Sequence, residues 1–106
     1  MNKFVLLYFG EPKFKTAKQA KEHQAAWMKW AKGLGDAIVE MGNPAKPGKM
    51  VTKKSVSDSD GADRFTGYTI IQAKDLDQAV KYTQSCPFVI DGGTMAVHEM
   101  MSMGSK

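Results

Sequence analysis

The segment Lys3–Phe9 reads KFVLLYF, and the fold prediction begins from it. Every residue after Lys3 is apolar or aromatic, so both faces of an extended chain would be apolar here. This pattern is typical of a central strand that is buried on both sides. Phe65–Gln72 has the same character and is rich in aromatic and β-branched residues, which favour strands. We therefore expect these two segments to form the middle of a sheet.

A long helix is predicted between the two strands. Thr16 stands three residues before Gln19, which is the spacing of a helix capping box, so the helix should run from about Ala17 to Leu34. The glycines Gly33 and Gly35 mark its end. Residues spaced three and four positions apart form one stripe along this helix, and we expect this stripe to be its buried face. The stripe consists of Ala20, His23, Trp27, Trp30, Ala31 and Leu34.

A second helix begins near Asp75, which stands three residues before Gln78, and it should stop at Cys86-Pro87 because proline breaks a helix. Three further segments are expected to be strands: Ala37–Met41, Met50–Val56 as an edge strand, and Thr94–Met103. Ser57–Asp63 is expected to be a polar loop.

The order strand, helix, strand, strand, helix, strand predicts an α+β fold of the ferredoxin-like βαββαβ type. Its two helices would cover one face of an antiparallel sheet and leave the other bare. In Thr94–Met103 both faces are apolar, with Met95 and Val97 on one and Ala96 and His98 on the other. A bare apolar face marks an association surface, so we expect a homodimer packed sheet to sheet.

Length and charge narrow the class of protein. The 106 residues suit a single domain with one core, spanning 1–106. The net charge is +4, but all 15 basic residues except Arg64 are lysines and acids interrupt them, so we expect no nucleic-acid partner. The single cysteine, Cys86, and the lack of any long apolar run predict a cytoplasmic protein with no membrane segment.

Several short motifs follow one another along nearly the whole chain: Lys3–Tyr8, Leu34–Ala37, Gly42-Asn43-Pro44, Asp60-Gly61-Ala62, Phe65–Tyr68, Cys86-Pro87-Phe88 and Gly92–Val97. In this order and spacing they resemble the YCII-related, or DGPF-domain, family of small bacterial proteins. The resemblance implies a dimeric α/β barrel. It also implies a cofactor-free reaction of the isomerase or lyase type on a small molecule, so no cofactor is expected. No metal is expected either, because the two histidines, His23 and His98, show no HxxxH or HxxE spacing.

The resemblance further implies a catalytic pair of histidine and aspartate. The histidine falls on His23, on the first helix. In one branch of the family the aspartate precedes a proline after the second helix, and that position here is Cys86. Asp36 and Asp60 are then the remaining candidates for the catalytic carboxylate.

The residues themselves allow two functions. In the first, His23 moves a proton in a cleft between the first helix and the sheet, because imidazole titrates near neutral pH. The expected ligand-binding residues are Trp27, Tyr68 and Arg64, the last as a clamp for a small anionic or aromatic ligand. In the second, His23 is sealed under Trp27 and Trp30, and the protein is a non-catalytic binding or regulatory module.

Overall fold

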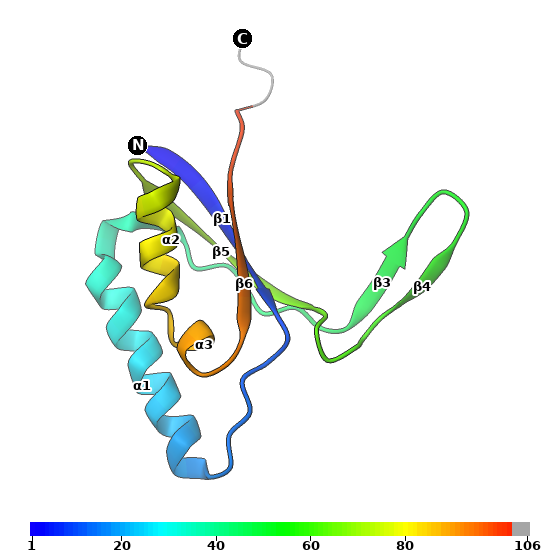
Figure 1. Cartoon of the computed structure of the whole chain (residues 1–106), viewed down its shortest axis with the longest axis horizontal. Coiled ribbons are helices and arrows are strands. Elements are labelled where there is room, and N and C mark those ends of the chain that lie inside the picture. The colour runs from blue at the N-terminus through cyan, green and yellow to red at the C-terminus, as the bar shows by residue number, and fades with distance from the viewer. Residues whose placement is uncertain (103–106) are drawn as a thin grey trace.

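The computed structural model describes residues 1–102 (Figure 1). Its elements follow one another in this order: β1 (Asn2–Phe9), α1 (Ala17–Leu34), the 3-10 helix η1 (Gly35–Ala37), β2 (Ile38–Glu40), β3 (Gly48–Val51), β4 (Val56–Ser59), β5 (Phe65–Ala73), α2 (Leu76–Gln84), α3 (Pro87–Ile90) and β6 (Thr94–Glu99).

The main sheet has the strand order β2-β5-β1-β6, and all of its neighbouring strands are antiparallel. Each helical connection therefore crosses over one intervening strand, as in the ferredoxin-like arrangement. Figure 1 shows α1 and α2 on the same side of the sheet. The predicted α+β ferredoxin-like fold is confirmed, and the strands predicted from Lys3–Phe9 and Phe65–Gln72 are its two central strands.

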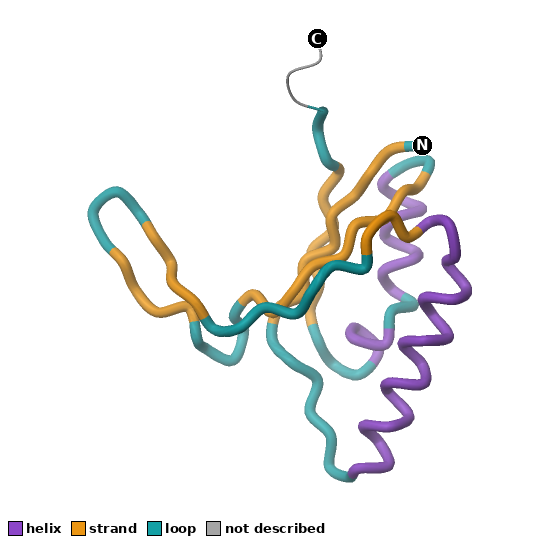
Figure 2. Tube along the Cα trace, turned by 180° about the vertical axis from the view of Figure 1, so that it is seen from behind, coloured by secondary structure: helices purple, strands orange, loops and turns teal. Residues whose placement is uncertain are grey.

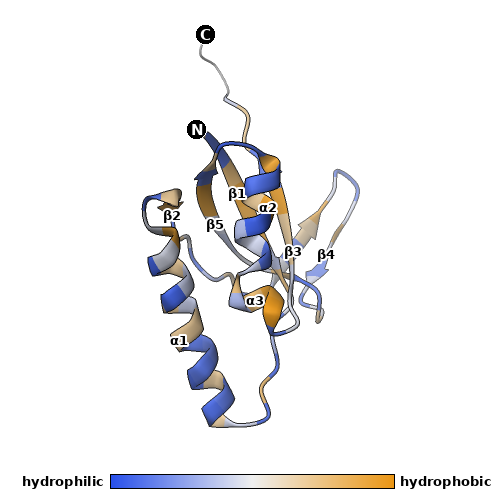
Figure 3. Cartoon of the chain, turned by 60° about the vertical axis from the view of Figure 1, so that its left-hand side comes forward, coloured by the Kyte–Doolittle hydropathy of each residue, from blue (hydrophilic) through white to orange (hydrophobic). Residues whose placement is uncertain are grey.

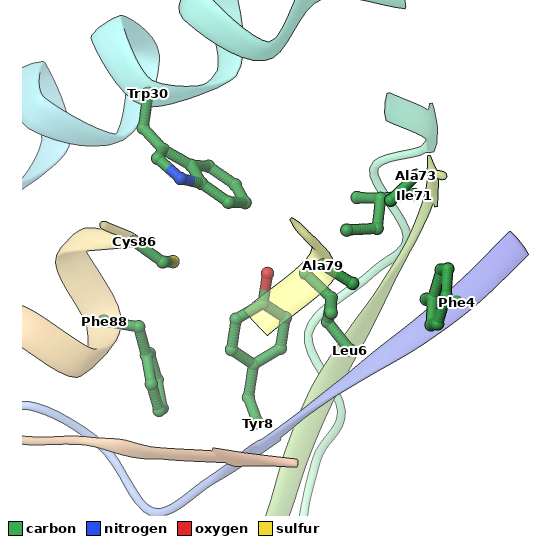
Figure 4. Packing of buried hydrophobic residues seen from close by; sticks show 9 residues of the cluster. All are labelled: Phe4, Leu6, Tyr8, Trp30, Ile71, Ala73, Ala79, Cys86 and Phe88. Atoms are coloured by element: carbon green, nitrogen blue, oxygen red, sulfur yellow. The ribbon is translucent and has the colours of Figure 1, made fainter. Parts of the chain in front are cut away.

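The core lies between the helices and one face of the two central strands. Phe4 and Leu6 of β1 are fully buried there, opposite Ile71 and Thr69 of β5. Side chains alternate between the faces of a strand, so these residues point the same way, toward the helices. Figure 4 shows Trp30 of α1, together with Cys86 and Phe88, closing over this layer.

Both predicted helix caps form. The Thr16 hydroxyl accepts a hydrogen bond from the Gln19 amide at 3.1 Å, and the Asp75 carboxylate accepts one from the Gln78 amide at 2.8 Å. Such caps satisfy amides that have no partner inside the helix. Figure 3 shows hydrophilic and apolar residues alternating along α1, and apolar residues on β1 and β5 behind α2. Among the residues that the structure describes, no helix has the length and apolar character needed to cross a membrane.

The predicted edge strand Met50–Val56 is wrong, because the chain reverses direction within it. Thr52 and Ser55 hold a turn, with the Ser55 amide donating to the Thr52 hydroxyl at 3.0 Å. The two halves form the β3–β4 hairpin, whose second strand also takes the first residues of the predicted loop Ser57–Asp63. Figures 1 and 2 show this hairpin projecting away from the main sheet.

Two other boundaries differ from the prediction. α2 ends at Gln84, just before the predicted stop at Cys86-Pro87, and Pro87 starts α3, since proline fits the first turn of a helix. The last strand is shorter than predicted and ends at Glu99, which pairs with Phe4, and the Met100 amide donates to the Lys3 carbonyl at 2.8 Å. Met103 lies outside the described residues.

The second face of the sheet carries no helix. Its residues alternate with the buried ones and are half-buried or exposed: Val5, Leu7, Phe9, Tyr68, Ile70, Ala96 and His98. Met95 and Val97 pack against the core instead. We call this second surface the open face.

Gly93 is expected to tolerate no side chain. A β-carbon there would lie 2.4 Å from the ring of Phe88, a core residue held in α3. Gly93→Ala should therefore lower the free energy of unfolding by about 1–3 kcal/mol. Gly33→Ala is the matched control, because nothing lies within 4 Å of its added β-carbon and alanine favours a helix. It should stabilise the protein by about 0.5–1 kcal/mol. Urea unfolding of both variants measures the difference, and equal effects would contradict the packing.

Cys86 is expected to be unreactive in the folded protein. It is fully buried, and desolvation raises the pKa of its thiol to about 11. Only the thiolate is nucleophilic, so at pH 8 the native protein should react with iodoacetamide about 100-fold more slowly than the chain unfolded in urea. The native rate should rise with pH until the pH approaches that pKa. A native rate at pH 8 equal to the unfolded rate would contradict this burial.

Candidate functional site

His23 lies in the first half of α1 and belongs to the predicted apolar stripe. The ring of Phe14, from the segment before α1, packs against it with the ring centroids 4.9 Å apart. The His23 side chain keeps 11% of its surface exposed, so the imidazole forms a wall that a small molecule can touch.

Asp91 is the carboxylate that pairs with His23. Its Oδ2 forms a close hydrogen bond and ion-pair contact with the imidazole Nδ1. Asp91 caps the end of α3, where its backbone amide donates to the Pro87 carbonyl at 2.8 Å. The short helix packs against α1 and therefore presents the carboxylate to His23.

Trp27 makes a hydrogen bond with the other imidazole nitrogen of His23. Its indole Nε1 donates a hydrogen bond to His23 Nε2 at 2.8 Å. An indole N–H can only donate, so Nε2 is the acceptor and the ring carries its proton on Nδ1, facing Asp91. A carboxylate bound to one nitrogen in this way fixes the tautomer and leaves the lone pair of the other nitrogen as the basic site.

A cavity of about 610 Å³ opens beside this pair, and we call it the His23 cavity. Phe14 and Trp30 give it aromatic surface, and charged side chains of both signs line it. These are Lys13, Lys29, Glu22 and Asp91. A cavity of this size admits a small ring with polar substituents.

A second cavity of about 330 Å³ lies between α1 and the start of β5, and we call it the Trp27 cavity. Trp27 and Tyr68 both line it, as does Glu11, whose carboxylate accepts a hydrogen bond from Arg64 at 3.1 Å. The predicted ligand-binding residues Trp27 and Tyr68 therefore meet at this cavity, while Arg64 is held by Glu11.

Tyr68 makes a hydrogen bond from its hydroxyl to the Glu40 carboxylate. This bond raises the pKa of the tyrosine hydroxyl, because the phenolate would repel the carboxylate that now accepts its proton. Burial raises the pKa of Tyr8 as well, and the Tyr8 hydroxyl shares a hydrogen bond with Thr69 at 2.7 Å.

Neither predicted aspartate partners His23. Asp36 lies in η1, beyond the end of α1, and the helix from His23 to Leu34 alone spans roughly 16 Å. Asp60 follows β4 of the projecting hairpin. The carboxylate that the structure does bring to His23 is Asp91, which was not among the predicted candidates, and the short helix α3 that positions it was not predicted. Its only sequence signal is an acid directly after the apolar run Phe88–Ile90.

Comparison with a solved structure supports the fold. The chain is similar to the 5-chloro-2-hydroxyhydroquinone dehydrochlorinase of Burkholderia phenoliruptrix AC1100, whose structure holds 2,5-dihydroxybenzoquinone. The TM-score is 0.57, the sequence identity is 16%, and the match covers 93% of each chain. At this identity the likeness shows the fold alone.

One protein-family model matches almost the full sequence. No curated protein matches the chain. The family model described as the YCII-related domain matches residues 2–103, so the resemblance found in the sequence motifs is confirmed, and the chain belongs to the YCII-related family.

Proposed function

We propose that this protein is an enzyme that moves a proton on a small hydroxylated ring, with His23 as the acid–base group. The observation that carries the proposal is the hydrogen-bonded series Asp91, His23, Trp27 beside the His23 cavity. Asp91 orients the imidazole and stabilises the positive charge that forms on it, which is the role of a carboxylate in acid–base catalysis.

The step begins when a substrate hydroxyl replaces the Trp27 N–H at His23 Nε2. Nε2 accepts the hydroxyl proton, and the electron pair of the broken O–H bond forms a carbonyl as the ring electrons shift. In an isomerisation, the imidazolium returns the same proton to a ring carbon. In an elimination, the imidazolium first returns the proton to the ring carbon that carries the halide. Nε2 then accepts the proton of a second hydroxyl, the electron pair of that O–H bond forms a second carbonyl as the halide leaves, and the proton passes from His23 to water. Both steps balance without any other reactant.

The solved structure named above supports this substrate class. That protein is a dehydrochlorinase, and its ligand is a planar, dihydroxylated quinone. The His23 cavity offers matching chemistry, because Phe14 supplies a ring face while Lys13 and Lys29 supply ammonium groups for oxygen substituents. Eliminations and isomerisations of such rings need a base but no electron acceptor.

The proposal is tested with 5-chloro-2-hydroxyhydroquinone, following chloride release and the visible spectrum. His23→Asn keeps a donor toward Asp91 but removes Nε2, so it should lower kcat/KM about 100-fold or more. Asp91→Asn keeps the shape but loses the charge, and it should lower kcat about 100-fold.

The matched control is Asp77→Asn, which makes the same chemical change on an exposed position of α2. It should leave the rate unchanged. If His23→Asn and Asp91→Asn turn over chlorinated hydroquinones as fast as the wild type, His23 is not the acid–base group.

A non-catalytic binding module is the second candidate. It is favoured by one observation: Trp27 and Asp91 already occupy both nitrogens of His23. In that case the wild type would bind 2,5-dihydroxybenzoquinone, lose affinity on His23→Asn, and turn over neither chlorinated nor unchlorinated hydroquinones.

We also propose that the open face pairs with the open face of a second copy. The support is its composition, because Val5, Leu7 and Ile70 leave apolar surface in contact with water at the centre of the sheet. Two such faces packed together would bury it, and a two-fold arrangement makes the surface self-complementary.

Ile70→Lys should convert the dimer to a monomer, because it places a charge in the centre of the proposed interface. Light scattering measures the mass, and circular dichroism checks the fold. The matched control, Met28→Lys, lies on the exposed side of α1 and should remain dimeric. A monomeric wild type, or a dimeric Ile70→Lys variant, would contradict the proposed pairing of the open faces.

A further inference from the structure

The Trp27 cavity has walls that differ from those of the His23 cavity. Three aromatic rings stand together at one side of it: the centroids of Tyr8 and Trp27 are 5.7 Å apart, and those of Tyr8 and Phe88 are 5.0 Å apart. Met41 and Pro44 face them from the segment that follows β2. The interior is therefore mainly apolar and aromatic, as in sites that hold a planar ring.

The polar groups inside this cavity are already engaged with one another. The Tyr8 hydroxyl is bonded to Thr69, and the Thr69 hydroxyl donates to the Met41 carbonyl at 2.7 Å. The Thr66 hydroxyl donates to the Gly10 carbonyl at 2.8 Å. A ligand that enters this interior gains little by bringing polar atoms, so the cavity selects apolar surface.

The charged side chain that lines this cavity is Glu11. Its side chain is largely exposed, which places it at the opening, and Arg64 holds one of its oxygens. A hydroxyl group on the outer end of a ligand could donate a hydrogen bond to this carboxylate. A carboxylate on the same ligand could not, since it has no proton to donate.

The wall formed by the segment after β2 is rigidly placed. Gly42 has a φ of +76°, and a β-carbon there would lie 1.9 Å from the Tyr68 carbonyl. Pro44 forms a bridge to Gly67, and the Ala45 amide donates to the Thr66 carbonyl at 2.8 Å. The cavity is therefore bounded by backbone that is tied to β5, so it exists before a ligand arrives, which lowers the cost of binding.

We propose that the Trp27 cavity is a separate binding site for a small uncharged phenol, whose ring lies against Trp27 and whose hydroxyl faces Glu11. The site does not depend on acid–base chemistry at His23. Trp27 is nevertheless shared by both sites, because the same indole lines this cavity and holds Nε2 of His23.

The test is an NMR titration of the full chain with p-cresol, whose methyl group would enter the cavity. The Trp27 indole N–H and the amides of Gly67 and Thr69 should shift and saturate. Amides at the His23 cavity, such as those of Glu22 and Ile90, should shift less. The carboxylate analogue p-toluate should bind about tenfold more weakly.

Met41→Trp fills the cavity with a larger side chain and should weaken p-cresol binding about tenfold or more. Met28→Trp makes the same substitution on the exposed side of α1 and should bind as the wild type does. If the NMR spectrum of Met41→Trp shows that this variant does not fold as the wild type does, Asn43→Phe is used in its place. Asn43 is exposed and lines the same cavity, so a larger side chain there should close the opening.

Asp91→Asn separates this proposal from the proposed enzyme, because Asp91 does not line the Trp27 cavity and has no hydrogen bond to Trp27. It should slow the proposed reaction but leave p-cresol affinity within about twofold. No saturable shift up to about 10 mM p-cresol, equal binding by the variant that fills the cavity, or shifts centred on Glu22 and Ile90 would each overturn the second site.

Discussion

The position of β1 at the centre of the sheet is the constraint on which the rest of the structure depends. β1 pairs with β5 along one edge and with β6 along the other, so its backbone groups are satisfied by strands and it can be buried. Its register with β5 sends Phe4, Leu6 and Tyr8 toward the helices. A slip of one residue in this register would turn these three side chains to the open face and remove them from the core.

The candidate site is connected to the end of this strand through side-chain contacts. Tyr8 is the last buried side chain of β1, and Trp27 of α1 packs against its ring. Trp27 in turn holds His23, which lies one helical turn nearer the N-terminus of α1. Trp27 therefore links the imidazole to the core, while the exposed part of the imidazole forms a cavity wall.

The two cavities differ in chemistry because they are built from different layers. The His23 cavity lies at helix surfaces, where lysines and acids are the usual exposed residues, so its lining is charged. The Trp27 cavity lies at the end of the sheet, where the side chains that point inward belong to the core. Trp27 connects them, because it lines the Trp27 cavity and its indole holds His23, which lines the other.

Local signals in the sequence predicted much of this architecture correctly. The caps at Thr16 and Asp75, the apolar stripe of α1 and the two central strands each depend on residues a few positions apart, so they can be read before the chain folds. The family was also evident from ordered motifs. His23 was identified by its place on the α1 stripe and by the resemblance, and the structure puts it in a cavity wall.

The partner of His23 was decided only by the tertiary structure. Asp91 is 68 residues away, and it reaches the imidazole because α3 turns back from Pro87 and packs beside α1. The reversal within Met50–Val56 depended on side-chain to backbone bonds between Thr52 and Ser55, which an alternating pattern does not reveal. The sequence by itself determined the two central strands and the helices α1 and α2, since those depend on neighbouring residues. Only packing decided which carboxylate meets the histidine, because contacts between distant segments exist only once the sheet and helices are assembled.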